Sequence, residues 1–420
     1  MASRGRSLLL IMVSSLLALG AISCSTGAPP VPTKAPATSP TTPASSSAAP
    51  AAAAPTAAAA PATSGNEIRV GALFNITGQS APQGALFSDS AKLAVKQINA
   101  AGGVNGKKIT LVTEDAQSTN PGALSALNKS VEQDHPLVIL GTNLSTQIQA
   151  MNDADKAAGV PFATGGTAVK NTQMGNPWIL RLRPDDSIAA AAMVQYIKDD
   201  MKLTKVGIIN DTDAFGRGGG DLVEQYSKAQ GLTVAKRVEY TAGTKDFTAQ
   251  LLAIKDAGAQ VVVGYTPRPD DAAMIEQQYR TIGAPYQFIG SPTFAEVDTL
   301  ALSKDAATGI YAVIDYMPGV TEVDKQYMAD YQKEYNSEAD GLAAYNRDAI
   351  YLFANAIKKV GEDRTKIRDA ILGIHGDWAG VCGTYNFTPN GDGLHANTVV
   401  QIDKGGKYKF IKTVQVQPKP

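Results

Sequence analysis

The stretch Gln-Ile-Asn-Ala-Ala-Gly-Gly-Val-Asn-Gly at residues 97–106 ends a helical pattern and leads into a strand. Before it, residues 85–100 have apolar side chains at helical spacing, and a loop connects them to the β-rich run 67–74. After it, residues 108–113 form a second β-rich run. A strand, a helix and a strand in this order predict a parallel sheet flanked by helices.

The same alternation continues along the chain and starts again near residue 205. The first set has further strands at 136–141, 160–163 and 178–183, and helices at 121–133, after Ser145 and at 188–200. The second set has strands at 205–210, 233–240, 261–265, 287–290 and 309–314, and helices at 219–230, 247–257 and 271–282. Helices within 321–359 and at 365–372 follow, and then a β-hairpin at 397–412. We therefore predict an α/β protein with two similar lobes.

Composition excludes several classes of function. The 420-residue chain has 38 Lys and Arg against 39 Asp and Glu, a formal charge of −1, whereas a nucleic-acid-binding protein needs a basic surface. Its two cysteines, Cys24 and Cys382, cannot form a disulfide framework. No zinc spacing is matched by the three histidines, His135, His375 and His395. We expect neither a metal nor a cofactor.

The first residues have the pattern of a secretory signal. Arg4 and Arg6 precede an apolar run at 8–22 that is too short for an ordinary membrane span. The run ends in Ala-Ile-Ser-Cys at residues 21–24, which resembles the lipobox of bacterial lipoproteins. That resemblance implies a signal peptide at 1–23 and acylation of Cys24. The alternative is an ordinary cleaved signal in which Cys24 is incidental.

Residues 24–65 have the composition of a tether. Between residues 25 and 65 there are 15 Ala, 13 Ser or Thr and 9 Pro, so no apolar face exists to bury. The frequent prolines favour a semi-extended chain. We expect a disordered spacer between the membrane and the folded part.

The folded part resembles a known family. From about residue 67 to 415 it is similar to the type I periplasmic solute-binding proteins of ABC importers, in the Leu/Ile/Val-binding class for branched-chain amino acids and amides. The motifs shared with this class are Thr77-Gly78, residues 97–106, Glu114-Asp115, residues 145–147, residues 165–167, Asp211 with Phe215-Gly216, residues 244–247 and Ile282-Gly283.

The resemblance implies two lobes joined by three crossovers, near Pro184, Asp315 and Ala379. The first lobe would comprise 66–184 and 315–379, and the second 185–314 and 380–420. It also implies that a small molecule is caught between the lobes and passed to an ABC transporter permease. The protein would act as a monomer outside the cytoplasm, held on the bacterial membrane through Cys24.

Two other functions remain open. The same bilobed fold serves in ligand-sensing receptors, so a sensor lipoprotein is the first alternative. An enzyme is the second, but no nucleophile and base pair or metal cluster is evident in the sequence. The glycine run 216–220 also lacks the Gly-Lys-Ser/Thr ending of a phosphate-binding loop. We therefore do not expect an enzyme.

Candidate ligand-binding residues of the first lobe follow two strands. Asn143, Leu144 and Ser145 open a helix, where free N–H groups and a hydroxyl suit a carboxylate. The alternative is that Ser145 only caps that helix. Gly165, Gly166 and Thr167 follow the next strand, and here the glycines would let a ligand approach the backbone. The alternative there is a turn that needs positive φ.

The other candidates are Gln83 after the first strand, and Phe215, Tyr265 and Thr293 from the second lobe. Amino-acid binders of the family commonly have an acidic residue near the position of Thr293, to pair with the ligand ammonium. Glu296, Asp270 and Asp271 are possible replacements, and an unpaired ammonium would be costly to bury. The ligand class therefore stays open between an amino acid, a neutral amide, and an aliphatic or aromatic carboxylate.

Overall fold

The structure is a computed structural model that describes residues 65–339 and 341–415. The predicted signal peptide, Cys24 and all but the last residue of the predicted tether lie outside the described residues.

The first sheet has five parallel strands in the order β2-β1-β3-β4-β5. They are β1 (Glu67–Phe74), β2 (Lys108–Asp115), β3 (Val138–Gly141), β4 (Phe162–Thr164) and β5 (Ile179–Arg181). The predicted parallel sheet is confirmed. Because all five strands run the same way, their carboxyl ends meet at one edge of the sheet, where ligands of such sheets bind.

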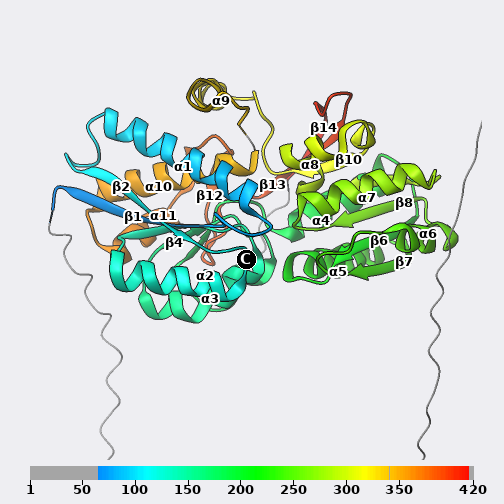
Figure 1. Ribbon diagram of the computed structural model, residues 1–420, viewed down its shortest axis with the longest axis horizontal. Coiled ribbons are helices and arrows are strands. Elements are labelled where there is room, and N and C mark those ends of the chain that lie inside the picture. Colours follow the sequence, from blue (N-terminus) through cyan, green and yellow to red (C-terminus); the bar gives the residue numbers. More distant parts are fainter. Residues whose placement is uncertain (1–64, 340, 416–420) are drawn as a thin grey trace, which may run out of the picture. The chain divides into compact units, whose positions relative to one another are not determined.

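Helices cover both faces of this sheet (Figure 1). Alternate β1 residues, from Ile68 to Phe74, pack with α1 (Ala81–Ala100), α10 (Gly341–Val360) and α11 (Arg364–Leu372). Leu73 and Ile139 pack on the opposite face with α2 (Asn120–Lys129) and α3 (Ser145–Ala158). The period of two along a strand divides these side chains between two cores.

The second sheet has seven strands in the order β14-β13-β10-β9-β8-β6-β7. The parallel strands are β6 (Lys205–Asp211), β7 (Thr233–Tyr240), β8 (Val261–Tyr265), β9 (Gln287–Gly290) and β10 (Tyr311–Ile314). The predicted C-terminal hairpin, β13 (Ala396–Ile402) and β14 (Tyr408–Gln415), adds an antiparallel edge beside β10. The restart of the pattern near residue 205 thus corresponds to a second sheet.

This sheet is also covered on both faces. On one side lie α4 (Asp186–Asp199) and α5 (Ala214–Ala229), and on the other α6 (Thr248–Asp256), α7 (Pro269–Thr281) and α8 (Val297–Ser303). Helix α5 begins five residues before the predicted start, because the side chain of Asp213 accepts a hydrogen bond from the Gly216 N–H and caps it.

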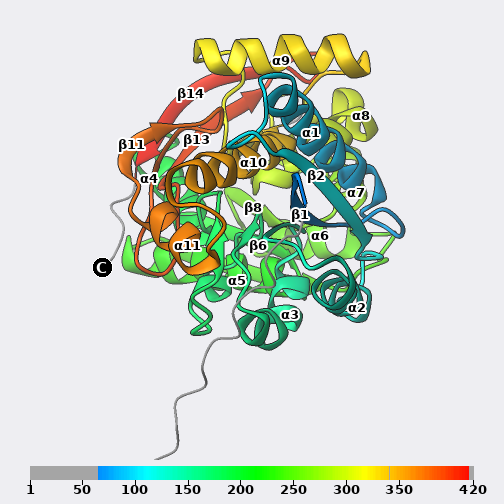
Figure 2. The ribbon, with the colours of Figure 1, turned by 90° about the vertical axis from the view of Figure 1, so that its left-hand side faces the viewer.

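The chain passes between the two sheets three times. The first passage lies between β5 and α4, and the second between β10 and α10, with α9 (Glu322–Tyr335) packing beside α1 (Figure 2). After α11, strands β11 (His375–Ala379) and β12 (Thr384–Asn386) form a hairpin of their own.

The third passage differs from the predicted position at Ala379. Tyr385, Phe387 and Leu394 belong to the core of the first sheet, so the chain crosses between Leu394 and β13. Residues 380–394, assigned from the sequence to the second lobe, therefore pack with the first. The sequence did not reveal this hairpin because its strands are short and most of their residues are exposed.

No helix in the described part of the chain is long and apolar enough to cross a membrane.

Candidate functional site

The loop after β3 is held in a strained, glycine-dependent form. Gly141 has φ 144°, Thr142 has φ 20°, and a Cβ at Gly141 would overlap the Leu73 carbonyl. Asn143 follows, and its Oδ1 atom is buried without a hydrogen-bond partner. The loop therefore presents an unsatisfied acceptor at the carboxyl edge of the first sheet.

Ser145 connects two loops of the candidate site. Its Oγ accepts hydrogen bonds from the Ala168 N–H at 3.1 Å and from Asn171 Nδ2 at 3.2 Å. The N-cap of α3 is Leu144, and no side-chain cap hydrogen bond forms there. The alternative that Ser145 caps its own helix is therefore wrong: its hydroxyl ties the loop after β3 to the loop after β4.

Gln147 is a positioning residue that the sequence motif contained but our prediction missed. Its Nε2 donates to Asn75 Oδ1 at 2.8 Å and to the carbonyls of Ala116 and Thr119 at 3.2 Å. Its Oε1 accepts from Asn75 Nδ2 at 3.2 Å and from the Thr142 hydroxyl. One buried amide thus joins the loops after β1, β2 and β3.

Glycine is required at positions 165 and 166 because neighbouring side chains leave no room for a Cβ atom. Neither has positive φ, so the alternative of a special turn is wrong. A Cβ at Gly165 would overlap the Tyr345 ring, and one at Gly166 would overlap Ile148. The Thr167 side chain is buried beside them. The glycines therefore bring the backbone close to neighbouring side chains.

Two aromatic candidates of the second lobe lie together. The rings of Phe215 and Tyr265 have centroids 5.0 Å apart, and both residues are buried. A Cβ at Gly219 would overlap the Tyr265 ring, and one at Gly216 would lie 2.5 Å from the Asp211 carbonyl. The glycine run in α5 thus allows the helix to approach β6 and β8 closely.

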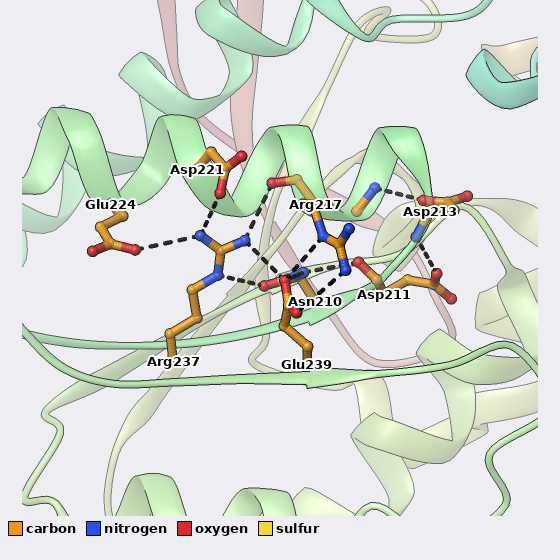
Figure 3. Close-up of polar contacts among 9 residues, drawn as sticks. Asn210, Asp211, Asp213, Arg217, Asp221, Glu224, Arg237 and Glu239 are labelled. Atoms are coloured by element: carbon orange, nitrogen blue, oxygen red, sulfur yellow. Dashed lines mark hydrogen bonds and ion pairs between the residues drawn. The ribbon is translucent and has the colours of Figure 1, made fainter. Parts of the chain in front are cut away.

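A polar network fastens α5 to the sheet (Figure 3). Arg237 of β7 donates to Asn210 Oδ1 at 2.9 Å and to Asp221 Oδ1 on α5 at 2.5 Å. Its Nη2 also donates to Glu239 Oε1 at 3.3 Å. This half-buried arginine holds the helix that presents Phe215.

Residues of both lobes meet at Glu296 and Arg183. Gln83 of α1 donates from Nε2 to Glu296 Oε2 at 2.5 Å, while its own Oε1 is buried without a partner. Arg183, only 6% exposed, pairs with Asp315 and donates to the Gly165 carbonyl at 2.9 Å. Burial acts to lower the pKa of Arg183, but the Asp315 carboxylate outweighs it, so the pKa is raised.

Tyr345 completes this group. Its ring lies against Gly165, and its hydroxyl is buried with no hydrogen-bond partner. We missed Arg183, Asp315 and Tyr345 as site residues. Arg183 and Asp315 follow β5 and β10, where the sequence indicated only crossovers between the lobes, and Tyr345 lies within α10, so each becomes part of the site only through packing.

Asp186 is a further residue that the sequence did not reveal. It is 1% exposed, its Oδ2 has no hydrogen-bond partner, and Tyr265 Oη lies 3.5 Å from its Oδ1. Burial raises the pKa of Asp186 to about 7, against the opposing effect of the Thr167 hydroxyl. Its neighbour Asp185 is the N-cap of α4, accepting from the Ser187 N–H at 2.7 Å. In the sequence Asp186 directly follows the capping residue Asp185, so nothing distinguished it as a candidate site residue.

The three acids named as replacements near Thr293 have different surroundings. Asp271 pairs with Arg268 at 2.9 Å, and Asp270 accepts from Gln79 at 3.2 Å in an exposed position. Glu296 is buried and reaches the first lobe through Gln83. Thr293 itself is buried, and its carbonyl accepts from the Thr299 hydroxyl at 2.6 Å.

One cavity adjoins Glu296, and a separate groove is lined by the sequence neighbours of Thr167 and Phe215. A small cavity of about 30 Å³ is lined by Glu296, Asp315 and Leu342, among others. A groove of about 470 Å³ lies between residues 168–173 and 212–222, at the start of α5. Across residues 65–339 and 341–415, no group of three or more His, Cys, Asp or Glu side chains is placed to hold a metal ion.

Comparison with known proteins identifies relatives along nearly the whole described chain. Leu/Ile/Val-binding protein homolog 1 of Brucella abortus is 25% identical over 349 residues, covering 82% of this chain and 94% of that protein. Homolog 8 of the same species is 29% identical over 309 residues, covering 69% and 76%.

Solved structures share the fold. A leucine-binding protein from Thermotoga maritima has a TM-score of 0.77 at 22% identity, covering 83% of this chain and 99% of its own. A branched-chain amino acid transporter substrate-binding protein from Streptococcus pneumoniae, in complex with isoleucine, has a TM-score of 0.76 at 24% identity, with coverages of 84% and 100%. An ABC transporter solute-binding protein from R. palustris, in complex with benzoate, has a TM-score of 0.74 at 20% identity, with coverages of 83% and 96%.

These structures confirm the predicted fold class. The family model described as periplasmic binding protein matches residues 67–407. The chain therefore belongs to the type I periplasmic binding protein family.

Proposed function

We propose that the protein is an extracytoplasmic solute-binding protein of an ABC importer, which captures a small molecule between its two lobes and delivers it to a membrane permease. The observation that supports this most directly is a set of polar atoms of the candidate site that are buried without hydrogen-bond partners: Gln83 Oε1, Asn143 Oδ1, Asp186 Oδ2 and the Tyr345 hydroxyl. Buried polar groups are normally hydrogen-bonded, so atoms of this kind indicate a site that a ligand completes.

The ligand head group would meet the first lobe. The start of α3 at Asn143, Leu144 and Ser145 favours a carboxylate or carbonyl oxygen, because helix N-termini concentrate free N–H groups. Gly165, Gly166 and Thr167 would supply backbone groups and a hydroxyl. The relatives named above bind leucine, isoleucine or benzoate, which all contain a carboxylate.

Closure would add the second lobe. Phe215, Tyr265 and Thr293 would cover the ligand, while Gln83 bonds to Glu296 and Gln79 to Asp270 across the lobes. A ligand that contacts both lobes stabilises the closed state by its differential affinity for it. No catalytic group is needed for this task.

Thermal unfolding of the purified protein with amino acids, amides and carboxylates would identify the ligand, since a ligand present at ~100 times its Kd adds ~2.7 kcal/mol to the free energy of unfolding.

Thr167→Val and Phe215→Ala should each weaken ligand binding by about tenfold, the equivalent of ~1.4 kcal/mol. The matched controls are Thr233→Val and Phe410→Ala, two exposed positions of the second sheet. Unchanged affinity in both site variants would show that the ligand binds elsewhere.

A further inference from the structure

The three passages between the sheets are joined by one polar cluster. Arg183 lies in the first passage, Asp315 begins the second, and Asn397 is the second residue of β13, directly after the third. Asp315 uses both of its carboxylate oxygens: Oδ2 pairs with Arg183, and Oδ1 accepts a hydrogen bond from Asn397 Nδ2 at 2.8 Å. We call Arg183, Asp315 and Asn397 the hinge triad.

The hinge triad has a contact in each lobe. On the side of the first lobe, Arg183 Nη1 donates to the Gly165 carbonyl at 2.9 Å, in the loop after β4. On the side of the second lobe, Asn397 Nδ2 also donates to the Ile314 carbonyl at 3.3 Å, at the end of β10. A continuous set of polar contacts therefore runs from a loop of the candidate site to two neighbouring strands of the second sheet.

The nearby Arg181 makes a different kind of connection. It pairs with Asp392 at 2.5 Å and donates to the Ala168 carbonyl at 2.7 Å. Asp392 precedes the third passage, in the segment that packs with the first sheet, so this ion pair lies within the first lobe. Of the two arginines, Arg183 is the one that reaches a carboxylate at the boundary between the lobes.

A gain in stability does not account for the hinge triad. The side chains of Arg183 and Asp315 are 7% and 9% exposed, and taking two charges out of water costs about as much as their attraction returns. Asn397 is buried, and its Oδ1 has no hydrogen-bond partner, which adds a further cost. Charged hydrogen bonds are, however, strongly directional, so the cluster is suited to holding its three segments in one orientation.

We propose that Asp315 is a positioning residue: through Arg183 and Asn397 it fastens the three passages to one another and sets the angle at which the lobes meet. Three separate connections could each twist independently, whereas joined connections bend as a unit. Lobe closure is absorbed by a few residues of such connections. The inference rests on the proposed function for its use in ligand capture, and it names the residues that orient the two halves of the site.

Asn397→Ala tests the hinge triad, because it releases the third passage and leaves the buried ion pair of Arg183 with Asp315 in place. Spin labels on the full-length protein report the distance between the lobes by double electron–electron resonance. The labels are attached after Lys156→Cys in α3 and Gln225→Cys in α5, two exposed positions, with Cys24 and Cys382 both replaced by serine. Without added solute, we expect the distance distribution to be about twofold wider in Asn397→Ala than in the parent protein, because the third passage then moves independently.

The matched control is Asn176→Ala. Asn176 is also buried, and its Nδ2 likewise donates to one carbonyl, of Asn152 at 3.1 Å, and to one carboxylate, of Asp155 at 2.7 Å. All three of these residues belong to the first lobe. The control should therefore lose a similar amount of stability and keep the narrow distance distribution of the parent protein.

A second variant decides the outcome if Asn397→Ala does not fold. Arg183→Met combined with Asp315→Leu replaces the buried ion pair by apolar side chains, an exchange that often preserves stability. It removes the connection between the first and second passages, so the distance distribution should again widen.

The possible results are distinguishable. A distribution as narrow as that of the parent protein, in either folded variant, would overturn the role of Asp315. Equal broadening in Asn176→Ala would overturn it too, since the loss of any buried amide would then have the same effect. The proposed function fails separately, if no amino acid, amide or carboxylate stabilises the protein against thermal unfolding. The distance measurement needs no solute, so it still decides whether the hinge triad orients the lobes.

Discussion

At the scale of single residues, the structure buries several acids whose proton affinity depends on the fold. Glu276 of α7 is 0% exposed, and neither of its carboxylate oxygens has a hydrogen-bond partner. Burial raises its pKa from 4.5 to about 8, while the Ser303 hydroxyl acts in the opposite direction. The folded protein therefore keeps a proton on Glu276 that the unfolded chain releases at neutral pH.

This linkage predicts the direction of a pH effect on stability. Between pH 4.5 and 8 the unfolded chain binds fewer protons at this site, so the free energy of unfolding should fall with rising pH, by up to about 1.4 kcal/mol per unit from Glu276 alone. Glu276→Gln should remove that slope and make the protein more stable than wild type at pH 8. Urea unfolding at pH 6, 7 and 8 measures how the free energy of unfolding depends on pH. The control is Glu132→Gln, a substitution at an exposed position. Equal slopes for wild type and Glu276→Gln would show that Glu276 is ionised in the folded state.

At the scale of elements, α5 shows how a glycine run can serve packing. Gly216, Gly219 and Gly220 each face a neighbour that leaves no room for a Cβ: the Asp211 backbone, the Tyr265 ring and the Asn210 and Arg237 side chains respectively. Gly218, in the same helix, has no atom within 4 Å of its Cβ position. The three crowded glycines let the helix lie close to the strands that present the candidate site.

Two alanine substitutions in this helix should therefore have opposite effects. Gly219→Ala should destabilise the protein by about 1–3 kcal/mol, because the new methyl group must displace Tyr265. Gly218→Ala should be neutral or stabilising by up to about 1 kcal/mol, since alanine favours the helix and meets open space. Urea denaturation of both variants gives the comparison. A similar loss of stability in each would mean that α5 depends on backbone freedom rather than on close packing.

At the scale of the whole molecule, the family implies a location outside the cytoplasm, and residues 1–24 contain the signal and lipobox-like pattern. Acylation of Cys24 would attach the folded part to the membrane through the Ala- and Pro-rich tether. Stable attachment needs more than one acyl chain, which bacterial lipoprotein processing would provide. This attachment is part of our proposal, since Cys24 lies outside the described residues.

Substitution of each cysteine in turn tests the proposed attachment. Cys24→Ser should move the protein from the membrane fraction to the soluble fraction of fractionated cells. Cys382→Ser, the half-buried second cysteine, should remain with the membrane and serves as the control. Membrane association that survives Cys24→Ser would contradict the assignment.

The sequence by itself determined the alternation of strands and helices, the restart of the pattern near residue 205, the C-terminal hairpin and the loops of the candidate site. These features depend on local periodicity and turn chemistry, which neighbouring residues specify. Two features were decided by tertiary structure alone. Residues 165 and 166 must be glycine because neighbouring side chains leave no room for a Cβ, not because the backbone has positive φ, and residues 380–394 pack with the first sheet. It also brought Asp186 to Tyr265 and Arg183 to Asp315. Such contacts join residues far apart in the chain, and whether a buried charge finds a partner depends on how the finished elements pack.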